Sequence, residues 1–173
     1  MFIMNVTHCI ERMDRFRHIL SALKISITPE EASFKPSEDD WSITEIVSHM
    51  YDIEVEDMRT RLRLTLEEPT TTWPPIDPEG WAIARHYSDN DFIEILDRLL
   101  DERVDSIAFL RAHVNADWLV THTHPKFGSM SAGDLLAAWC SHDALHLRQI
   151  TKRLYQMTQQ DATPFRTQYA GEW

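Results

Sequence analysis

The sequence predicts an all-α fold, a single four-helix bundle, and three observations support this prediction. Glycine is scarce, with 4 residues among 173, and apolar residues make up 43% of the chain, a composition that suits compact helical proteins. Long segments repeat apolar residues every three or four positions, which is the period of an amphipathic helix. Capping patterns precede several of these segments. The length is that of one domain, so residues 1–173 are expected to share one core.

The first predicted helix covers residues 4–23. Its apolar residues recur at helical spacing and define one face: Val6, Ile10, Met13, Phe16, Ile19, Leu20 and Leu23. A polar connection containing Pro29 and Pro36 comes next, because proline interrupts helical hydrogen bonding.

Three further helices are expected to begin at capping boxes, in which an N-cap serine stands three residues before an acidic residue. The pairs are Ser42/Glu45, Ser88/Asp91 and Ser131/Asp134, which predict helices over residues 43–65, 89–114 and 132–157. Each box is flanked by apolar residues able to touch across the first turn, namely Trp41 with Ile46, Tyr87 with Phe92, and Met130 with Leu135. The box and its apolar pair therefore indicate the same three starts.

The connections differ in length. A long one, rich in proline, precedes the third helix and contains Trp73 and Trp81, which could line the mouth of a pocket. A shorter connection before the fourth helix contains His122 and His124, interpreted as structural or solvated loop residues. The tail, about 158–173, is expected to be peripheral.

Charge and composition restrict the partners. A net charge of −11 and a pI near 5.2 disfavour nucleic-acid binding. No segment approaches the roughly 20 apolar residues that span a bilayer, and the start lacks the basic region of a signal peptide. Cys9 and Cys140 form neither a disulfide framework nor a C-x-x-C site, as is typical of a reducing compartment. The sequence thus predicts a cytoplasmic protein that binds neither nucleic acid nor a membrane.

Histidines occupy apolar positions of two predicted helices. His142 and His146, four residues apart, lie on the buried seam of the fourth helix, so their imidazoles share one face. His49 lies on the seam of the second helix, between Ile46 and Ile53. Each histidine alone could be a hydrogen-bonded core residue. Because all three lie on seams, facing helices would let them bind one metal ion.

The expected ion is a divalent transition metal. Three neutral imidazoles favour zinc or nickel, with iron or copper as further candidates, over calcium or magnesium, and they leave a coordination position open. Cys140 is expected to point away from this site, and Asp143 to face solvent. Asp52, one turn beyond His49, is a weak candidate for moving a proton, and Glu56 is expected to be solvated.

Two segments resemble the DinB-like superfamily of damage-inducible and thiol-transferase four-helix bundles. DDWSITEIVSHMYDIE resembles the family's W-S-x-x-E-x-x-x-H segment, and GDLLAAWCSHDALHLRQI is similar to its final H-x-x-x-H-x-x-Q-I signature. The resemblance spans residues 5–157. It implies an up-up-down-down bundle with a long connection, a metal held by His49, His142 and His146, and a homodimer.

What the resemblance implies about activity is less specific. Family members with an assigned activity use a low-molecular-weight thiol such as bacillithiol, mycothiol or glutathione, and the metal lowers the pKa of that thiol. A metal-dependent thiol S-transferase acting on a small electrophile is therefore the leading hypothesis. The alternatives are a metal-dependent hydrolase and a non-catalytic, stress-related metal- or ligand-binding bundle.

Overall fold

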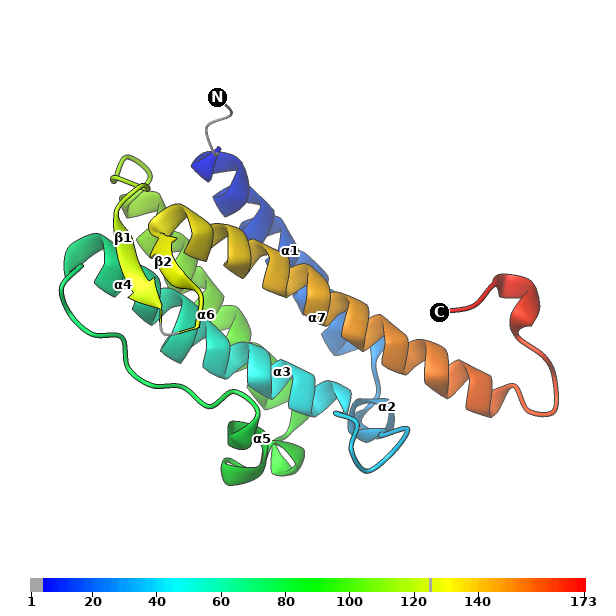
Figure 1. Ribbon diagram of the computed structural model, residues 1–173. Coiled ribbons are helices and arrows are strands. Elements are labelled where there is room, and N and C mark those ends of the chain that lie inside the picture. Colours follow the sequence, from blue (N-terminus) through cyan, green and yellow to red (C-terminus); the bar gives the residue numbers. More distant parts are fainter. Residues whose placement is uncertain (1–4, 125) are drawn as a thin grey trace.

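Long helices packed side by side form most of the computed structural model, which describes residues 5–124 and 126–173 (Figure 1). They are α1 (Val6–Ser26), the continuous segment α3 (Ile43–Asp52), η1 (Ile53–Arg59) and α4 (Thr60–Glu67), then α6 (Phe92–Ala112) and α7 (Ala132–Asp161). The connections contain α2 (Pro29–Ser33), α5 (Gly80–Ala84) and the 3-10 turn η2 (Tyr87–Asp89), and the tail after α7 contains the 3-10 turn η3 (Gln168–Ala170). The predicted four-helix bundle is confirmed. None of the described helices is both long enough and apolar enough to cross a membrane.

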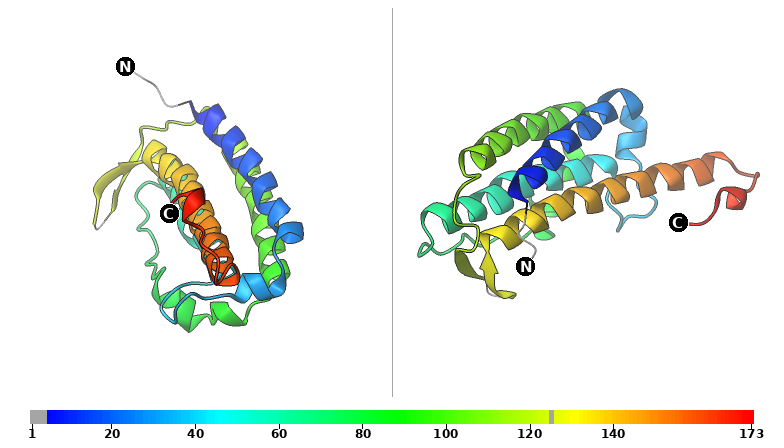
Figure 2. Two further views of the ribbon diagram at one scale, coloured as in Figure 1. Left: turned by 90° about the vertical axis from the view of Figure 1, so that its right-hand side faces the viewer. Right: turned by 90° about the horizontal axis from the view of Figure 1, so that it is seen from above.

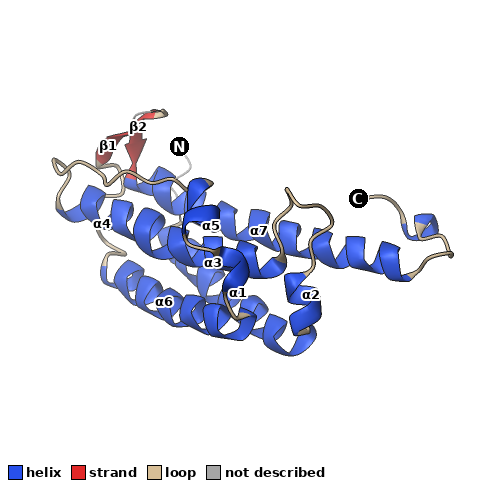
Figure 3. Cartoon of the chain, turned by 90° about the horizontal axis from the view of Figure 1, so that it is seen from below, coloured by secondary structure: helices blue, strands red, loops and turns tan. Residues whose placement is uncertain are grey.

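The connection before α7 forms a β-hairpin that the sequence did not predict. Strands β1 (Thr121–His124) and β2 (Gly128–Ser131) pair antiparallel, with His122 opposite Met130. Figure 3 shows the hairpin at one end of the bundle and α2 toward the other.

The helices are arranged so that α1 and α3 each pack against both α6 and α7. In Figures 1 and 2, α1 and α7 run in one direction while α3 and α6 run in the other. The order along the chain is therefore up, down, down, up, which differs from the up-up-down-down order implied by the resemblance. Only residues 27–42 separate α1 from α3, so α3 begins near the end where α1 finishes. The predicted long connection is present and joins α4 to α6.

Two of the predicted capping boxes are confirmed. Ser42 Oγ accepts a hydrogen bond from the Glu45 N–H at 3.2 Å, and the Ser42 N–H donates to Glu45 Oε2 at 2.7 Å. Ser131 and Asp134 form the same reciprocal pair at the start of α7.

The third predicted box, at Ser88, is wrong. Ser88 lies in the separate turn η2, which comes directly after His86 in the left-handed region at φ 51°, so the chain has not yet entered a helix. Helix α6 begins at Phe92, and its N-cap is Asp91, whose side chain accepts from the Glu94 N–H at 2.9 Å.

Other helix ends also differ from the predicted ranges. Helices α1 and α7 extend past the predicted ends at residues 23 and 157, whereas α6 is shorter than the predicted 89–114. The predicted start of the first helix, residue 4, lies outside the described residues. The end of α7 projects beyond the other helices, and the tail after it lies at the surface, as expected (Figures 1 and 2).

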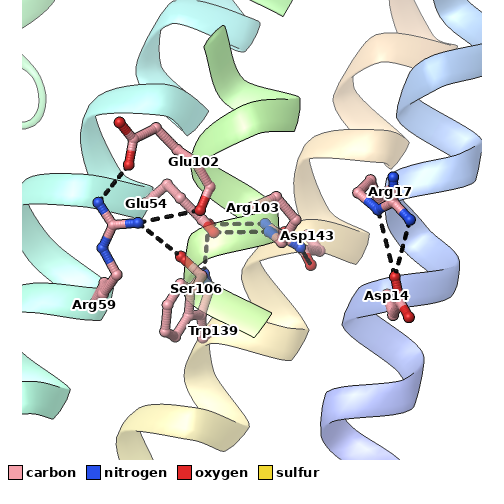
Figure 4. Close-up of polar contacts among 9 residues, drawn as sticks. All are labelled: Asp14, Arg17, Glu54, Arg59, Glu102, Arg103, Ser106, Trp139 and Asp143. Carbon is pink, nitrogen blue, oxygen red and sulfur yellow. Dashed lines mark hydrogen bonds and ion pairs between the residues drawn. The ribbon is translucent and has the colours of Figure 1, made fainter. Parts of the chain in front are cut away.

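The predicted helix 43–65 is interrupted by a π-helical segment, η1. Within it, Glu54 is 1% exposed and faces Arg103 of α6, which is also 1% exposed. Arg103 Nε and Nη2 donate to the two Glu54 carboxylate oxygens at 2.8 and 2.9 Å (Figure 4). The indole Nε1 of Trp139 donates to the same carboxylate at 2.8 Å.

Asp143 of α7 completes this buried ion cluster. Its carboxylate accepts two hydrogen bonds from Arg103, at 2.7 and 2.8 Å, and the residue is 3% exposed. The expectation that Asp143 faces solvent was wrong, because its partner is on another helix. Burial raises the pKa of the Asp143 carboxyl, although the hydrogen bonds and charge of Arg103 oppose this shift. The ion cluster Glu54–Arg103–Asp143 thus links η1, α6 and α7.

Replacing Arg103 by methionine is expected to destabilise the fold by about 3–5 kcal/mol, because two buried carboxylates lose their cation. Chemical denaturation measures this change. Arg15→Met is the control, since the exposed Arg15–Glu11 pair should contribute at most about 1 kcal/mol. Equal, small effects of the two substitutions would contradict the structural role given to the ion cluster.

Candidate metal centre

The structure brings together the three histidines that the sequence singled out. His49 comes from α3, and His142 and His146 come from α7, which packs against α3. Each of the three, which together form the histidine triad, offers a ring nitrogen, and these atoms all lie within 4.8 Å of one another. His49 is buried, whereas His142 and His146 are partly exposed. The triad is therefore buried on its α3 side and partly exposed on its α7 side.

The rings of the triad face one another at close range. The ring centroid of His49 lies 5.4 Å from that of His142 and 4.8 Å from that of His146. The Nε2 atoms of His142 and His146 are 2.9 Å apart. Trp41, just before the α3 cap, packs beside His49 at a centroid distance of 5.0 Å.

Gln149 orients one of these rings. Its side-chain oxygen lies 2.9 Å from Nδ1 of His146. An amide oxygen only accepts hydrogen bonds, so Nδ1 carries the proton and the lone pair of Nε2 points toward His142. The sequence reasoning did not select Gln149. Two signals were available: Gln149 is the glutamine of the H-x-x-x-H-x-x-Q-I signature, and it lies three residues after His146 on the same helix face.

Burial keeps the triad neutral. Desolvation and, to a smaller extent, the nearby His146 lower the pKa of His49 to about 4, although the Pro78 carbonyl acts in the opposite direction. Desolvation lowers the pKa of His142 to about 2 and also depresses the pKa of His146. Neutral imidazoles keep the lone pairs that a metal ion needs.

The donor set fits a transition metal ion. Nδ1 of His49 is buried and has no hydrogen-bond partner among the described residues, so this nitrogen remains unsatisfied by the protein. No carboxylate of the described residues belongs to the group. Nitrogen ligands without carboxylates suit zinc, nickel, iron or copper better than magnesium or calcium.

Asp52, the weak catalytic candidate, lies outside the triad. It is 6% exposed, accepts a hydrogen bond from the Tyr87 hydroxyl, and forms an ion pair of 2.8 Å with Arg85. Its carboxylate therefore fastens the turn before α6 to α3. Glu56 is partly solvated, as expected, but it also binds Arg85 through two hydrogen bonds, of 2.6 and 3.0 Å.

The two cysteines lie close together and away from the triad. Cys140 Sγ is 3.8 Å from the Cys9 carbonyl oxygen, and both residues pack against the apolar cluster between α1 and α7. Burial, together with the neighbouring Cys9 thiol, raises the pKa of Cys140 to about 12. Such a thiol is a poor nucleophile.

His122 and His124 belong to strand β1, and the expectation of a loop was wrong because the hairpin partner β2 had not been recognised. The His122 ring stacks on Trp73 at 4.3 Å, and its Nε2 lies 2.9 Å from the Thr71 carbonyl oxygen. These contacts support the structural interpretation of the pair. Trp81, also expected near a pocket, lies in α5 with the Arg85 guanidinium 4.1 Å from its ring centre.

In the presence of a chelator, stability is expected to fall as the pH decreases from 6.5 toward about 5. The folded triad resists protonation while the unfolded chain accepts protons below pH 6.5, so acid favours unfolding. The contribution is roughly 1.4 kcal/mol per pH unit for each fully buried histidine. Urea denaturation across this range should give a shallower slope for His49→Gln and an unchanged slope for His8→Gln, which alters an exposed residue. Identical slopes for the parent and His49→Gln would contradict the assignment.

Comparison with known proteins gives consistent matches. The chain is 26% identical, over 144 residues, to Putative metal-dependent hydrolase OB0413 of Oceanobacillus iheyensis, and the match covers 82% of this chain and 80% of that protein. YfiT from Bacillus subtilis, described as a probable metal-dependent hydrolase with an unusual four-helix bundle topology, has a TM-score of 0.78 and 19% identity, covering 88% of this chain and 87% of that one. TT2238, a four-helix bundle protein, has a TM-score of 0.56 and 20% identity, covering 85% and 98% of the two chains.

The two structural matches share the four-helix fold of this chain. The model of the DinB superfamily matches residues 12–150, which include all three histidines of the triad and most of the four long helices. This chain is therefore a member of the DinB superfamily.

Proposed function

We propose that the protein is a metal-dependent S-transferase that joins a low-molecular-weight thiol to a small electrophile. The observation that carries the proposal is the histidine triad, a group of neutral nitrogen donors without a carboxylate among the described residues. His49, His142 and His146 would hold the ion, with Gln149 fixing the His146 ring. A bound transition metal ion would lower the pKa of a thiol that coordinates it. In the transfer, a sulfur–carbon bond forms, the bond to the leaving group breaks, and the thiol proton passes to solvent.

The surrounding carboxylates favour a thiol over water as the nucleophile. Hydrolysis at such a centre is assisted by a base that receives the proton of the metal-bound water, although the metal itself already lowers the pKa of that water. Asp52 is engaged by Arg85 and Tyr87, and Asp143 by Arg103, so neither is free to do this. A thiol needs less help, because its own pKa is far closer to neutrality than that of water.

The thiol is expected to come from outside the protein. Cys140 is directed toward α1 and has a raised pKa of about 12, which disfavours the thiolate. The partial exposure of His142 and His146 leaves the triad open to a small molecule on that side.

Metal-dependent hydrolysis is the second candidate, favoured by the descriptions of OB0413 and YfiT. The same three nitrogens could hold an ion that activates water. Product analysis separates the candidates, since only transfer incorporates the added thiol into the product.

Purified protein is expected to contain about one transition metal ion per chain, because three ligands and an open position form a common site. Elemental analysis should show that His142→Ala and His146→Ala lose most of it. Gln149→Ala should retain the site but bind metal about 10–100-fold more weakly, because His146 loses its orienting partner. His8→Ala is the control, with full metal content. Stoichiometric metal in the His142 and His146 variants would refute the assignment.

A Cys9→Ser, Cys140→Ser double variant is expected to keep the metal and any thiol-transfer activity of the parent, whereas His49→Ala should lose both. The reason is that the nucleophile is supplied by the added thiol. Metal-loaded proteins would be screened with several thiols and electrophiles, and products identified by mass spectrometry. A folded, metal-loaded double variant without activity would show that a protein cysteine is required. Products that form without thiol would instead support hydrolysis.

A further inference from the structure

A cavity of about 300 Å³ opens between α3, α6 and the turn η2. Ser48, Tyr51 and Asp52 line it from α3, and Arg98 lines it from α6. The histidine triad does not contribute to its described lining. The proposed function therefore leaves this cavity without a role.

Arg98 is held in this cavity without a charged partner. Its Nη2 donates to the Tyr51 hydroxyl at 2.8 Å, and its Cζ lies 4.4 Å from the centre of the Tyr51 ring. No carboxylate of the described residues forms an ion pair with it. The stacking holds the guanidinium in place while most of its N–H groups remain free. Such a preorganised fork is suited to the two oxygens of a carboxylate or phosphate.

Both acidic residues of the cavity are engaged by Arg85, which offsets one of their two negative charges. Arg85 binds Glu56 through two hydrogen bonds and also forms an ion pair with Asp52. The hydroxyl of Tyr87 donates to Asp52 as well. An anion entering the cavity would therefore meet the free charge of Arg98, while the carboxylates opposite are held by Arg85.

The amide of Asn90 adds a second polar group that is fixed in position. Its Nδ2 donates to Ser48 Oγ at 2.9 Å, and Ser48 Oγ in turn donates to the Thr44 carbonyl oxygen at 2.8 Å. The side-chain oxygen of Asn90 is thereby left to accept a hydrogen bond from a hydroxyl or amine of a ligand.

We propose that this cavity binds the oxyanion group, a carboxylate or a phosphate, of a small molecule through Arg98, independently of the metal centre. The net charge of −11 repels anions in general, so saturable binding of an anion requires a local site of this kind. The Tyr51 ring and hydroxyl act as the support that positions the guanidinium.

Isothermal titration calorimetry with succinate, with inorganic phosphate and with neutral succinamide tests the proposal. The parent protein is expected to bind at least one of the two anions at one saturable site, and not succinamide. Succinate binding alone would identify a carboxylate site, and phosphate binding alone a phosphate site. Arg98→Gln should weaken the binding by about tenfold or more, because a charge-assisted pair of hydrogen bonds is lost.

Two controls separate this site from others. Arg111→Gln alters another exposed arginine of α6, paired with Asp14 at 2.9 Å, and should bind the anion like the parent. His142→Ala disables the metal centre and should also leave the binding unchanged, so a failure of the metal proposal would not affect this result. Arg98→Lys, which keeps the charge without the fork, should bind with intermediate strength and replaces Arg98→Gln if that variant does not fold.

The proposal is overturned if neither anion binds the parent saturably, if Arg98→Gln binds like the parent, or if Arg111→Gln loses as much binding. Loss of anion binding in His142→Ala would also overturn it, because the anion would then be a ligand of the metal centre.

Discussion

The arrangement of the bundle depends on the pairing of one buried cation. Arg103 could not remain charged in the core without acceptors, and the structure supplies them from two other helices, as Glu54 and Asp143. Along α6, the cation separates an apolar cluster that ends at Leu99 from another that begins at Ile107. The two apolar clusters give cohesion through contacts that are not directional. The ion cluster adds a directional constraint on the register of the helices, because a shift of one turn would break its hydrogen bonds.

The same register creates the histidine triad. Asp143 comes directly after His142, and Glu54 lies on the helix of His49, less than two turns beyond it. When Arg103 holds both carboxylates, the segments that carry these two histidines are brought opposite each other. The buried ions and the nitrogens of the histidine triad are thus adjacent parts of one polar layer across the middle of the bundle. This proximity also explains why the nearby carboxylates are unavailable for proton transfer: they are already used to hold the helices.

Features encoded within one helix could be predicted, whereas features that depend on a partner helix could not. The caps at Ser42 and Ser131 and the seam positions of His142 and His146 can be derived from local spacing. Asp143 was wrongly predicted to be exposed, because a charged residue in a helix is expected to face solvent unless its counterion is known. That counterion, Arg103, is 40 residues away in the sequence. Ser88 and Asp91 are each followed by an acidic residue three positions later, so either could be the N-cap of the third long helix. The turn that begins at His86 decides that Asp91 is the N-cap, and local spacing does not predict this turn. The π segment has no sequence pattern that distinguishes it from an ordinary helix.

The π segment Ile53–Arg59 has a further consequence for how the long helix can vary. A π turn accommodates an extra residue relative to an α turn, so it changes the angular phase between the helical turns on its two sides. Upstream, His49 is directed at α7, and downstream, Leu62 is fully buried in the cluster at the other end of the bundle. The two halves of the helix can therefore present their inward faces at angles that a uniform helix would not allow. Removing one residue from this segment would therefore rotate the face that carries Leu62 by about 100° relative to the face that carries His49.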